Sequence, residues 1–416
     1  MKIAVIGSGI SGLSAAYLLQ GQHEVHLFER DTRLGGHAHT HDVGRGSDSF
    51  VVDTGFMVFN ERTYPHFVRL LAELGVKGRP SDMSFGVSCR RCGLEYASRH
   101  PGTLFAQPAR LADAGHWKML ADVLRFFRDA RRFLASDAGH DVSLGEFLAE
   151  RQYGPGLASH FLLPMCGAIW SASYGDMREF PARSLFQFYA NHGLLAPTGA
   201  PVWQTVVGGS RAYVDAIARR LGPRVHLGDG AARIERDERG VSVTFDSGTT
   251  RRFDKVVVAT HADQALALLS DTSLEERELL GSFRYSRNRT VLHTDRRLLP
   301  ARRAAWASWN CHVDDCTDER APASLTYHLN RLQGLPGRDE ICVSLNDDRV
   351  RPESVIAEMD YTHPILDRAA IEAQPRVEAI NGARHTYFAG AHLRYGFHED
   401  GLVSALAVAR RIGVTW

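Results

Sequence analysis

Three glycines near the start of the chain, Gly7, Gly9 and Gly12, have the spacing of a turn that binds a diphosphate. In this pattern the first glycine allows a tight turn, the second lets the backbone approach the phosphates, and the third lets a helix pack closely on a strand. A carboxylate follows at Glu29, at the distance where it can bind a ribose hydroxyl. Together these residues predict a binding site for a dinucleotide.

The elements that must position these residues are also visible in the sequence. An apolar run over 2–6 predicts a fully buried strand, and apolar residues at helical spacing predict a helix over 13–20. Ile10 and Ser11 lie at the start of this helix, where unpaired N–H groups and the positive end of the helix dipole would face the phosphates. A second strand over 24–28 then ends at Glu29, which completes the unit.

The loop after Glu29 distinguishes between two dinucleotides. Gly35, Gly36 and His37 stand where an NAD-binding domain would continue into another helical crossover. This arrangement resembles the FAD-binding fold of amine oxidases, phytoene desaturases and protoporphyrinogen oxidases. The resemblance implies that the N–H groups of the two glycines bind FAD phosphates, with Arg30 also at the cofactor. The family usually has arginine at position 37, and the imidazole of His37 can still donate a hydrogen bond.

Further cofactor contacts are implied by the same resemblance. They fall on Thr54 and Gly55, on the backbone of Ala231 and Ala259, and on the C-terminal residues Gly390, Ala391, His392, Gly401, Leu402 and Val403. Related flavoproteins have an acid, which grips the ribitol, where this chain has His392. The helix expected to open at Gly401 would aim its positive end at the flavin pyrimidine and stabilise negative charge there.

The predicted fold class is α/β, with a Rossmann-like FAD domain of the glutathione-reductase type and an inserted α+β substrate domain. We expect the FAD domain to comprise 1–65, 205–265 and 375–416, and the substrate domain to comprise 66–204 and 266–374. Within the FAD domain, 225–245 predicts a hairpin or meander before a buried strand over 255–260. In the substrate domain, a helix is expected over 117–135 and strands over 289–294, 324–329 and 341–345.

Several phrases point to a closer family. They are 53–60, 81–85, 330–333, 363–364 and 395–401. Over nearly the whole chain they resemble a bacterial group of predicted NAD/FAD-binding amine-oxidase-like proteins. Members of that group often accompany, or are fused to, cyclopropane-fatty-acid synthases and related lipid methyltransferases. The association implies a lipid-type substrate and a possible methyltransferase partner.

The candidates for catalysis are His392, Tyr395 and His398, which precede the helix expected to face the flavin. A histidine or carboxylate there could remove a proton as hydride leaves the substrate. We expect Tyr395 or His398 to contact the substrate. The neighbouring acids Glu399 and Asp400 are equally well explained as caps of the helix.

Three functions follow as hypotheses. The leading one is an FAD-dependent oxidoreductase that acts on an unsaturated or modified acyl chain. The others are a redox-neutral double-bond isomerase and a non-catalytic FAD-bearing partner of a lipid methyltransferase. Amine oxidation is disfavoured, because those enzymes often use a lysine near the flavin. Lysines occur only at 2, 77, 118 and 255, and Arg289 lies nearest the expected position.

Two groups of residues could bind a metal, and for both we favour another explanation. His37, His39 and His41 would share one face of an extended segment, but the resemblance places His37 against the cofactor. Cys89 and Cys92 could be half of a zinc site. Since Cys311 and Cys316 are too far apart in sequence to form a convincing second pair, we predict a hairpin turn and no metal.

Composition restricts the partners. The 416 residues carry a formal net charge of +1, so no overall field would attract nucleic acid. No segment reaches the roughly 20 apolar residues of a membrane span, and we expect a cytoplasmic protein. The arginine-rich helix over 117–135 could contact a lipid surface, although such a helix more often packs its apolar face inward.

Overall fold

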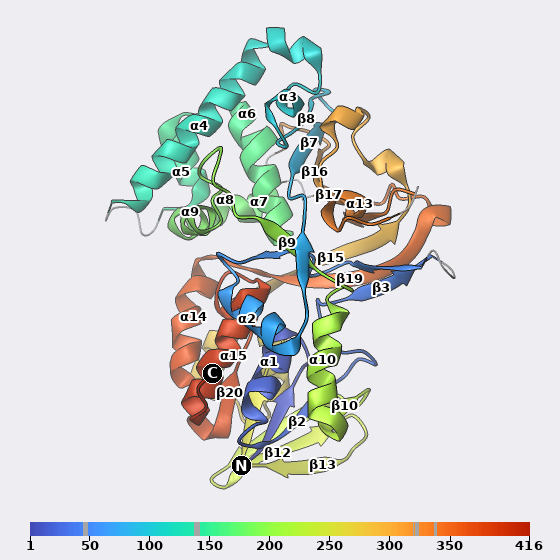
Figure 1. Cartoon of the computed structure of the whole chain (residues 1–416). Coiled ribbons are helices and arrows are strands. Elements are labelled where there is room, and N and C mark those ends of the chain that lie inside the picture. The colour runs from blue at the N-terminus through green and yellow to red at the C-terminus, as the bar shows by residue number, and fades with distance from the viewer. Residues whose placement is uncertain (45–48, 137–141, 319, 321–323, 337–338) are drawn as a thin grey trace.

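The computed structural model describes residues 1–44, 49–136, 142–318, 320, 324–336 and 339–416. Figure 1 shows two layers of structure, with a parallel sheet and its helices in the lower half and a helical layer in the upper half. Two long strands cross the molecule between them. Among the described residues, no helix is both long enough and apolar enough to cross a bilayer.

The lower sheet is parallel and five-stranded. Ile3 and Val5 of its central strand pack on one face, while Ala4 and Ile6 pack on the other. This alternation explains why the strand reads as one continuous apolar run. Residues from all three stretches of the predicted FAD domain contribute strands, and the predicted α/β class is confirmed. In spatial order the strands are β10 (Val225–Leu227), β2 (Glu24–Glu29), β1 (Lys2–Ile6), β14 (Lys255–Val258) and β20 (Thr386–Phe388).

Helices cover one face of this sheet, and a mixed layer covers the other. The first face carries α1 (Ile10–Leu19), α2 (Pro65–Leu74), α10 (Arg211–Leu221) and α15 (His398–Ile412). The second carries α11 (Ala262–Leu268), α12 (Leu274–Gly281) and α14 (Arg368–Ile380), together with the meander β11 (Ala231–Asp237), β12 (Gly240–Phe245) and β13 (Thr250–Phe253). The predicted meander is therefore present. Val225–Leu227 is not part of it, because this strand pairs in parallel with β2.

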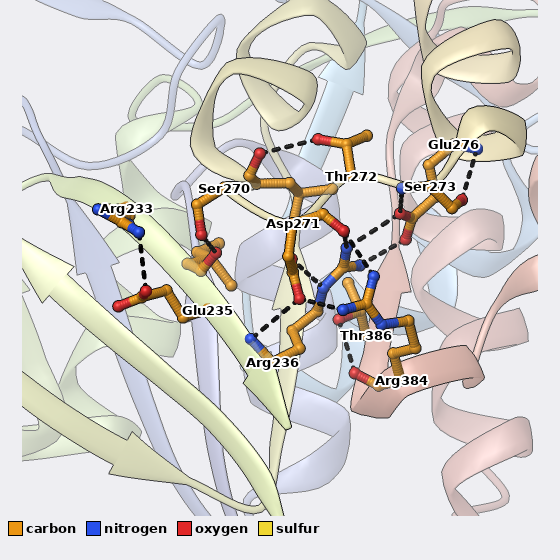
Figure 2. Close-up of polar contacts among 12 residues, drawn as sticks. Arg233, Glu235, Arg236, Ser270, Asp271, Thr272, Ser273, Glu276, Arg384 and Thr386 are labelled. Carbon is orange, nitrogen blue, oxygen red and sulfur yellow. Dashed lines mark hydrogen bonds and ion pairs between the residues drawn. The ribbon is translucent and has the colours of Figure 1, made fainter. Parts of the chain in front are cut away.

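A buried ion network fastens the meander to its surroundings (Figure 2). The Arg236 side chain is fully buried, and its Nε lies 2.8 Å from Asp271 Oδ1. Its Nη2 donates to Glu276 Oε2 over 2.9 Å, and Asp271 also pairs with Arg384. The network thus joins β11 to the start of α12 and to the turn before β20. Buried charges need such complete pairing, because an unpaired one is costly.

The upper half contains a seven-stranded sheet in which only β16 and β7 pair in parallel. Its order is β19 (Val355–Ile365), β15 (Arg284–His293), β18 (Cys342–Leu345), β17 (Ser324–His328), β16 (Trp309–Val313), β7 (Phe85–Cys89) and β8 (Glu95–Ala97). The strands predicted over 289–294, 324–329 and 341–345 all lie in it. The predicted hairpin turn at Cys89 and Cys92 is also present, between β7 and β8.

The helical layer packs around a core of aromatic and aliphatic side chains. Its elements are α4 (Ala114–Leu134), α5 (Leu144–Arg151), α6 (Pro155–Leu157), the π-helical turn η3 (Ala158–Leu162), α7 (Leu163–Trp170), α8 (Tyr174–Glu179) and α9 (Ala182–Asn191). The predicted long helix is α4, and it buries Met119, Phe126 and Phe133. Leu124 of the same helix is 57% exposed.

Short elements complete the chain. The strands are β3 (Thr40–Val43), β4 (Phe50–Asp53), β5 (Phe59–Asn60), β6 (Gly78–Pro80) and β9 (Trp203–Val206), and the helices are α3 (Pro101–Leu104) and α13 (Leu329–Leu332). The 3₁₀ turns are η2 (Pro108–Ala112), η4 (Gly222–Arg224), η5 (Arg296–Leu298), η6 (Arg303–Ala305), η7 (Pro352–Ser354), η8 (Ala383–His385) and η9 (Ala391–Leu393).

Candidate active site

The turn between β1 and α1 has the backbone that its glycines predict. Gly7 has φ +95°, and a Cβ atom there would lie 2.8 Å from the Ala259 carbonyl oxygen. A Cβ on Gly12 would lie only 1.8 Å from the Gly7 carbonyl oxygen, so the helix could not pack on the turn with a side chain there. A Cβ on Gly9 would meet nothing within 4 Å. No contact within the protein therefore requires glycine at position 9.

The second glycine turn packs against the first. Gly35 and Gly36 have φ values of +110° and +56°, in the region that favours glycine. A Cβ on Gly36 would lie 3.1 Å from the Gly9 Cα. The Gly35 N–H donates to the Ser8 carbonyl oxygen over 3.1 Å. The two turns thus form one cradle of backbone at the start of α1, which has no side-chain cap.

The acidic residue after β2 is fixed in place. Glu29 accepts hydrogen bonds from Ser8 N–H over 2.8 Å, from Ser8 Oγ over 2.5 Å and from Asp31 N–H over 3.0 Å. The next residue, Arg30, donates to the Ala231 carbonyl oxygen over 3.3 Å. The structure therefore brings together Glu29, Arg30 and Ala231, which were predicted to lie at the adenosine end of the cofactor.

The segment after β4 lies against the loop after the second glycine turn. A Cβ on Gly55 would lie 2.2 Å from the His37 carbonyl oxygen, which itself accepts from Phe56 N–H over 2.7 Å. The Thr54 hydroxyl lies 2.8 Å from the Tyr361 hydroxyl of β19. Through these contacts, the predicted contact residues Thr54 and Gly55 connect the cradle to the upper sheet.

The C-terminal helix meets α1 at its N-terminal end. α15 begins at His398, three residues before Gly401, so the prediction that Gly401 opens the helix is wrong. Gly401 lies in the first turn, where a Cβ would be 2.6 Å from Ile10 Cγ2 and 2.8 Å from Ser11 Oγ. Leu402 is buried in the core beside it. The glycine is needed for the close approach of the two helices.

The two acids before Gly401 cap two different helices. Asp400 accepts from the Phe397 N–H over 2.9 Å and so caps its own helix, as the capping explanation predicts. Glu399 instead accepts from the N–H groups of His66 and Phe67, over 3.1 and 2.9 Å, and caps α2. Burial raises the pKa of Asp400 to about 7. The capping explanation is thus supported for both acids, although Glu399 serves a neighbouring helix.

A cluster of rings lies where the lower sheet meets the two long strands. This ring cluster comprises His37, His261 (after β14), His392 (after β20), Tyr285 (β15), Tyr361 and His363 (both β19). Centroids of the His37 ring and the rings of Tyr361 and His363 are 5.1 and 5.2 Å apart, and His261 stacks on Tyr285 at 4.4 Å. His392 lies 6.4 Å from Tyr285. Ligands of open α/β sheets bind at the carboxyl ends of the strands, and the ring cluster occupies that edge.

The imidazoles of the ring cluster are uncharged at neutral pH. Burial lowers the pKa of His363 to about 4 and that of His392 to about 3, with nearby His261 as the second cause in both cases. Burial also lowers the pKa of His37 well below its ordinary value. The Nε2 atoms of His37 and His392 are buried and have no hydrogen-bond partner. Buried polar atoms are normally satisfied, so both atoms point to a bound group.

Amide side chains fix the orientation of His363. Asn346 donates from Nδ2 to Asn288 Oδ1 over 2.7 Å, which leaves the Asn288 NH₂ to donate to His363 Nδ1 over 3.1 Å. His363 therefore carries its proton on Nε2. The Tyr361 hydroxyl lies 2.9 Å from His39 Nδ1 as well as beside Thr54. These contacts hold the β19 side chains at the junction.

The three predicted catalytic side chains do not converge. His398 stacks on Phe56 with ring centroids 3.5 Å apart, and its Nε2 lies 2.9 Å from the Tyr213 hydroxyl, so it is part of the core beside α10. Tyr395 packs on Phe188 of the helical layer. Only His392 belongs to the ring cluster. The expectation that Tyr395 or His398 contacts the substrate is not supported by these positions, because the chain turns between them into the start of α15.

The structure also shows where two other groups of residues lie. Arg289 does not point to the junction, because it pairs with Asp348 and Glu358 on the exposed side of β15. His37, His39 and His41 do not form a metal-binding group. His39 and His41 stack on each other at 4.1 Å, while His37 turns into the ring cluster. In an extended segment all three would have shared a face, but the chain bends before β3.

Comparison with known proteins identifies the family. The pattern of flavin containing amine oxidoreductases matches residues 10–324, which is more than half of the chain. The chain belongs to this family. As a member of this family it uses FAD, as predicted.

Curated relatives share about a quarter of the residues of this chain. A coproporphyrinogen III oxidase of Mycobacterium leprae is 26% identical over 282 residues, covering 64% of this chain and 60% of that protein. A flavin-dependent L-tryptophan oxidase of Lentzea aerocolonigenes is also 26% identical, covering 62% and 57%. The matched part thus spans about 60% of the length of these relatives.

Solved structures share the fold over nearly the whole amine oxidoreductase chain. A CLA-producing fatty acid isomerase from P. acnes has a TM-score of 0.69 and 17% identity, with 99% of this chain and 98% of that chain covered. Cyclohexylamine oxidase from Brevibacterium oxydans has a TM-score of 0.67 and 17% identity, with 99% of each covered. The predicted FAD-binding fold is confirmed.

The residues at this site are suited to bind FAD. The open space at Gly9, the uncapped start of α1 and the two unpartnered imidazole nitrogens are what a diphosphate and its attached groups would complete. Bound FAD supplies the acceptor for hydride from a substrate C–H bond. The sequence did not single out His261, Tyr285, Asn288 or Tyr361, which reach the site from distant segments. Its one signal was the phrase that contains His363.

Proposed function

We propose that this flavoprotein takes hydride from a C–H bond of a lipid-type substrate, such as an unsaturated or modified fatty-acyl chain. The observation that carries the proposal is the ring cluster. Its members are buried or half-buried imidazoles and phenols, and burial lowers the pKa of the imidazoles, so that they are uncharged at neutral pH. An uncharged wall suits an apolar chain.

The lysines of the chain support the same choice. Lys2 pairs with Glu24, Lys118 with Asp122, and Lys255 lies 3.2 Å from the Tyr387 hydroxyl. The fourth, at position 77, is exposed. Since all four have places outside the ring cluster, the lysine that many amine oxidases use near the flavin has no counterpart here.

Neutral imidazoles line the junction where the flavin and the substrate would meet. The His392 Nε2 atom, which is buried and unpartnered, would form a hydrogen bond to the bound group there. His363, with its proton fixed on Nε2, would donate a hydrogen bond and position the substrate. Thr54 and Tyr361 would hold the junction closed against water.

A second candidate is a redox-neutral isomerase that passes hydride out and back while it shifts a double bond. The fold similarity to a fatty acid isomerase favours testing it. A third, which rests on the family resemblance alone, is an FAD-bearing partner of a cyclopropane-fatty-acid synthase or a related lipid methyltransferase. In that case deletion would change cellular lipids, but a His363 variant would not.

A lipid substrate also raises the question of access. We propose that the protein acts in the cytoplasm and contacts membranes through the outer face of α4. Trp117 and Leu124 lie on that face, seven residues apart, and are 50% and 57% exposed. Arg128 and Arg132 continue the same face and could meet anionic headgroups.

The test is anaerobic reduction of the bound flavin with panels of unsaturated lipids and of amines. We expect bleaching with a lipid and not with an amine. His363→Ala should slow bleaching at least tenfold while FAD content is unchanged, and His385→Ala, on an exposed turn, should match wild type. Turnover without consumption of oxygen or another acceptor would select the isomerase. Bleaching by amines alone would contradict the proposal of a lipid substrate.

A further inference from the structure

Four side chains that the mechanism does not use come together at one end of β7. They are Cys89, Cys92, Cys316 and His160. One ligand atom from each, three Sγ atoms and one imidazole nitrogen, lies within 4.8 Å of all the others. Among the described parts of the chain, no second group of three or more such residues is this close. The sequence predicted only a hairpin turn here, because it could not show that His160 and Cys316 face the same point.

Three distant segments supply these ligands. Cys89 and Cys92 flank the turn between β7 and β8, Cys316 follows β16, and His160 lies in η3 of the helical layer. In the turn the Gly93 N–H donates to the Cys89 carbonyl oxygen over 3.0 Å, and Gly93 has φ +68°. This left-handed residue reverses the chain directly after Cys92 and lets both thiols face the same side.

The histidine is oriented toward the thiols. His160 Nε2 lies 3.3 Å from Cys92 Sγ, while its Nδ1 lies 3.4 Å from the Ser159 hydroxyl. A histidine that binds a metal usually has its other nitrogen hydrogen-bonded in this way. The Tyr96 hydroxyl donates to the His160 carbonyl oxygen over 2.7 Å and holds this part of η3 against β8.

We propose that Cys89, Cys92, Cys316 and His160 bind one zinc ion in a tetrahedral structural site. Three thiolates and one imidazole are a set that zinc prefers, and four protein ligands leave no open position for a substrate. With Zn–S bonds of about 2.3 Å, sulfur atoms stand about 3.8 Å apart. The ligand atoms now lie within 4.8 Å of one another, so they need to move closer by at most about 1 Å to bind zinc.

Zinc binding would change the charge of the cluster. Zinc would displace three protons and leave a net charge of −1 on the group. Arg90 and Arg91 lie between the two cysteines of the turn, and Arg110 donates to the Cys92 carbonyl oxygen over 3.1 Å. Each of these arginines also pairs with an acid, Asp314, Asp315 and Asp113 respectively, so the charged groups around the site are balanced.

The position of the site indicates a structural role. β18 and β17 separate β16 from β15, which carries the ring-cluster residue Tyr285. Zinc would join the β7–β8 turn and the loop after β16 to the helical layer. These three segments are far apart in sequence. It would stabilise the substrate-binding half without taking part in flavin chemistry. This inference does not depend on the proposed function.

The test begins with the metal content of wild-type protein purified without chelators from zinc-supplemented culture. We expect about one zinc per chain, and tetrahedral thiolate–cobalt absorption when Co²⁺ replaces zinc. Cys316→Ser and His160→Ala should lose most of the metal and lower Tm. Cys311→Ser is the matched control, because Cys311 Sγ contacts the Pro164 carbonyl oxygen and not the cluster. It should keep the metal.

Three results would overturn the zinc site. One is reduced, FAD-bound wild type that contains no zinc and takes up neither Zn²⁺ nor Co²⁺. Another is a stable Cys89–Cys92 disulfide in the purified protein. The third is equal loss of metal in Cys311→Ser and Cys316→Ser, with FAD content normal in both. Because the wild-type measurements need no variant, misfolding of Cys316→Ser would leave the proposal testable.

Discussion

Gly36 lies directly against Gly9, so that a Cβ atom on Gly36 would be 3.1 Å from the Gly9 Cα. Two turns that are 27 residues apart in sequence therefore present their backbones at one place, the uncapped start of α1. Backbone N–H groups and the positive end of a helix dipole bind phosphates. This contact explains why glycine is needed at Gly36, and the shared backbone surface is the basis of the assignment of FAD to this site.

Gly9→Ala should separate cofactor binding from folding. Gly9 has φ −62° and open space around a Cβ atom, so alanine should change the free energy of unfolding of the FAD-free chain by less than about 0.5 kcal/mol. The methyl group would occupy the place of the diphosphate, and we expect FAD affinity to fall at least tenfold. Titration with FAD and thermal unfolding without it are the two measurements.

Gly12→Ala is the matched control for that experiment. Its Cβ would lie 1.8 Å from the Gly7 carbonyl oxygen, so the fold itself must shift. We expect a loss of stability of about 1–3 kcal/mol or more even without FAD. If Gly9→Ala destabilised the FAD-free chain as much as Gly12→Ala, the conclusion that a Cβ atom on Gly9 would meet open space would be wrong.

Arg236→Ala should destabilise the chain strongly. The change leaves Asp271 and Glu276 without their buried partner (Figure 2), and removal of one member of a buried pair costs about 3–5 kcal/mol. Arg233→Ala on the same strand removes only an exposed pair with Glu235, and we expect less than about 0.5 kcal/mol. Denaturant unfolding of the two variants measures the difference. Equal losses would contradict the account of this network.

Asp400 should make stability depend on pH. Burial raises its folded pKa from 3.8 to about 7, so the folded chain holds a proton there that the unfolded chain releases. Its contribution is fully present below pH 3.8 and is lost as pH rises through about 7. At about 1.36 kcal/mol per pKa unit, the loss is on the order of 4 kcal/mol.

Asp400→Asn tests this dependence, because asparagine keeps an oxygen that can accept from the Phe397 N–H. We expect the free energy of unfolding of the variant to fall less than that of wild type between pH 4 and pH 8. Asp263→Asn, at an exposed position in the first turn of α11, should follow the wild-type curve. Parallel curves for wild type and Asp400→Asn would show that Asp400 is ionised throughout.

If α4 contacts membranes, changes to its exposed apolar residues should weaken binding to lipid vesicles. Replacement of Trp117 and Leu124 by alanine removes exposed apolar area from one face of the helix, and binding to vesicles with anionic lipids should fall at least fivefold. Val202→Ala, at a residue that is 72% exposed elsewhere, should bind as wild type does. Co-sedimentation with vesicles measures both. If the double variant bound vesicles as well as wild type does, α4 would not be the membrane-binding surface.

The parts of this protein that the sequence predicted are those built from local patterns. The strand–glycine turn–helix unit at residues 2–19 is readable because the spacing of its three glycines and the apolar runs on either side are local patterns. The strands of the upper sheet were likewise visible as apolar runs. The start of α15 was placed too late, because Asp400 caps the helix from its third residue and acidic residues before Gly401 looked like flanking sequence.

The rest depends on contacts between distant segments. His363, Tyr361 and Asn288 reach the junction only because β15 and β19 pair over their whole length, and no local pattern reports that pairing. Tyr395 and His398 looked like a catalytic pair from their types, but the backbone turns them into two different cores. The thiols of the β7–β8 turn similarly acquire two further neighbours only in three dimensions.

The central claim, that the backbone at Gly9 and Gly36 holds FAD, is tested most directly by the visible spectrum and extracted flavin of the purified, folded chain. We predict the yellow spectrum of oxidised flavin and about one FAD per chain, present on purification or restored when FAD is added. Well-folded protein that is colourless and remains so with excess FAD would contradict the claim.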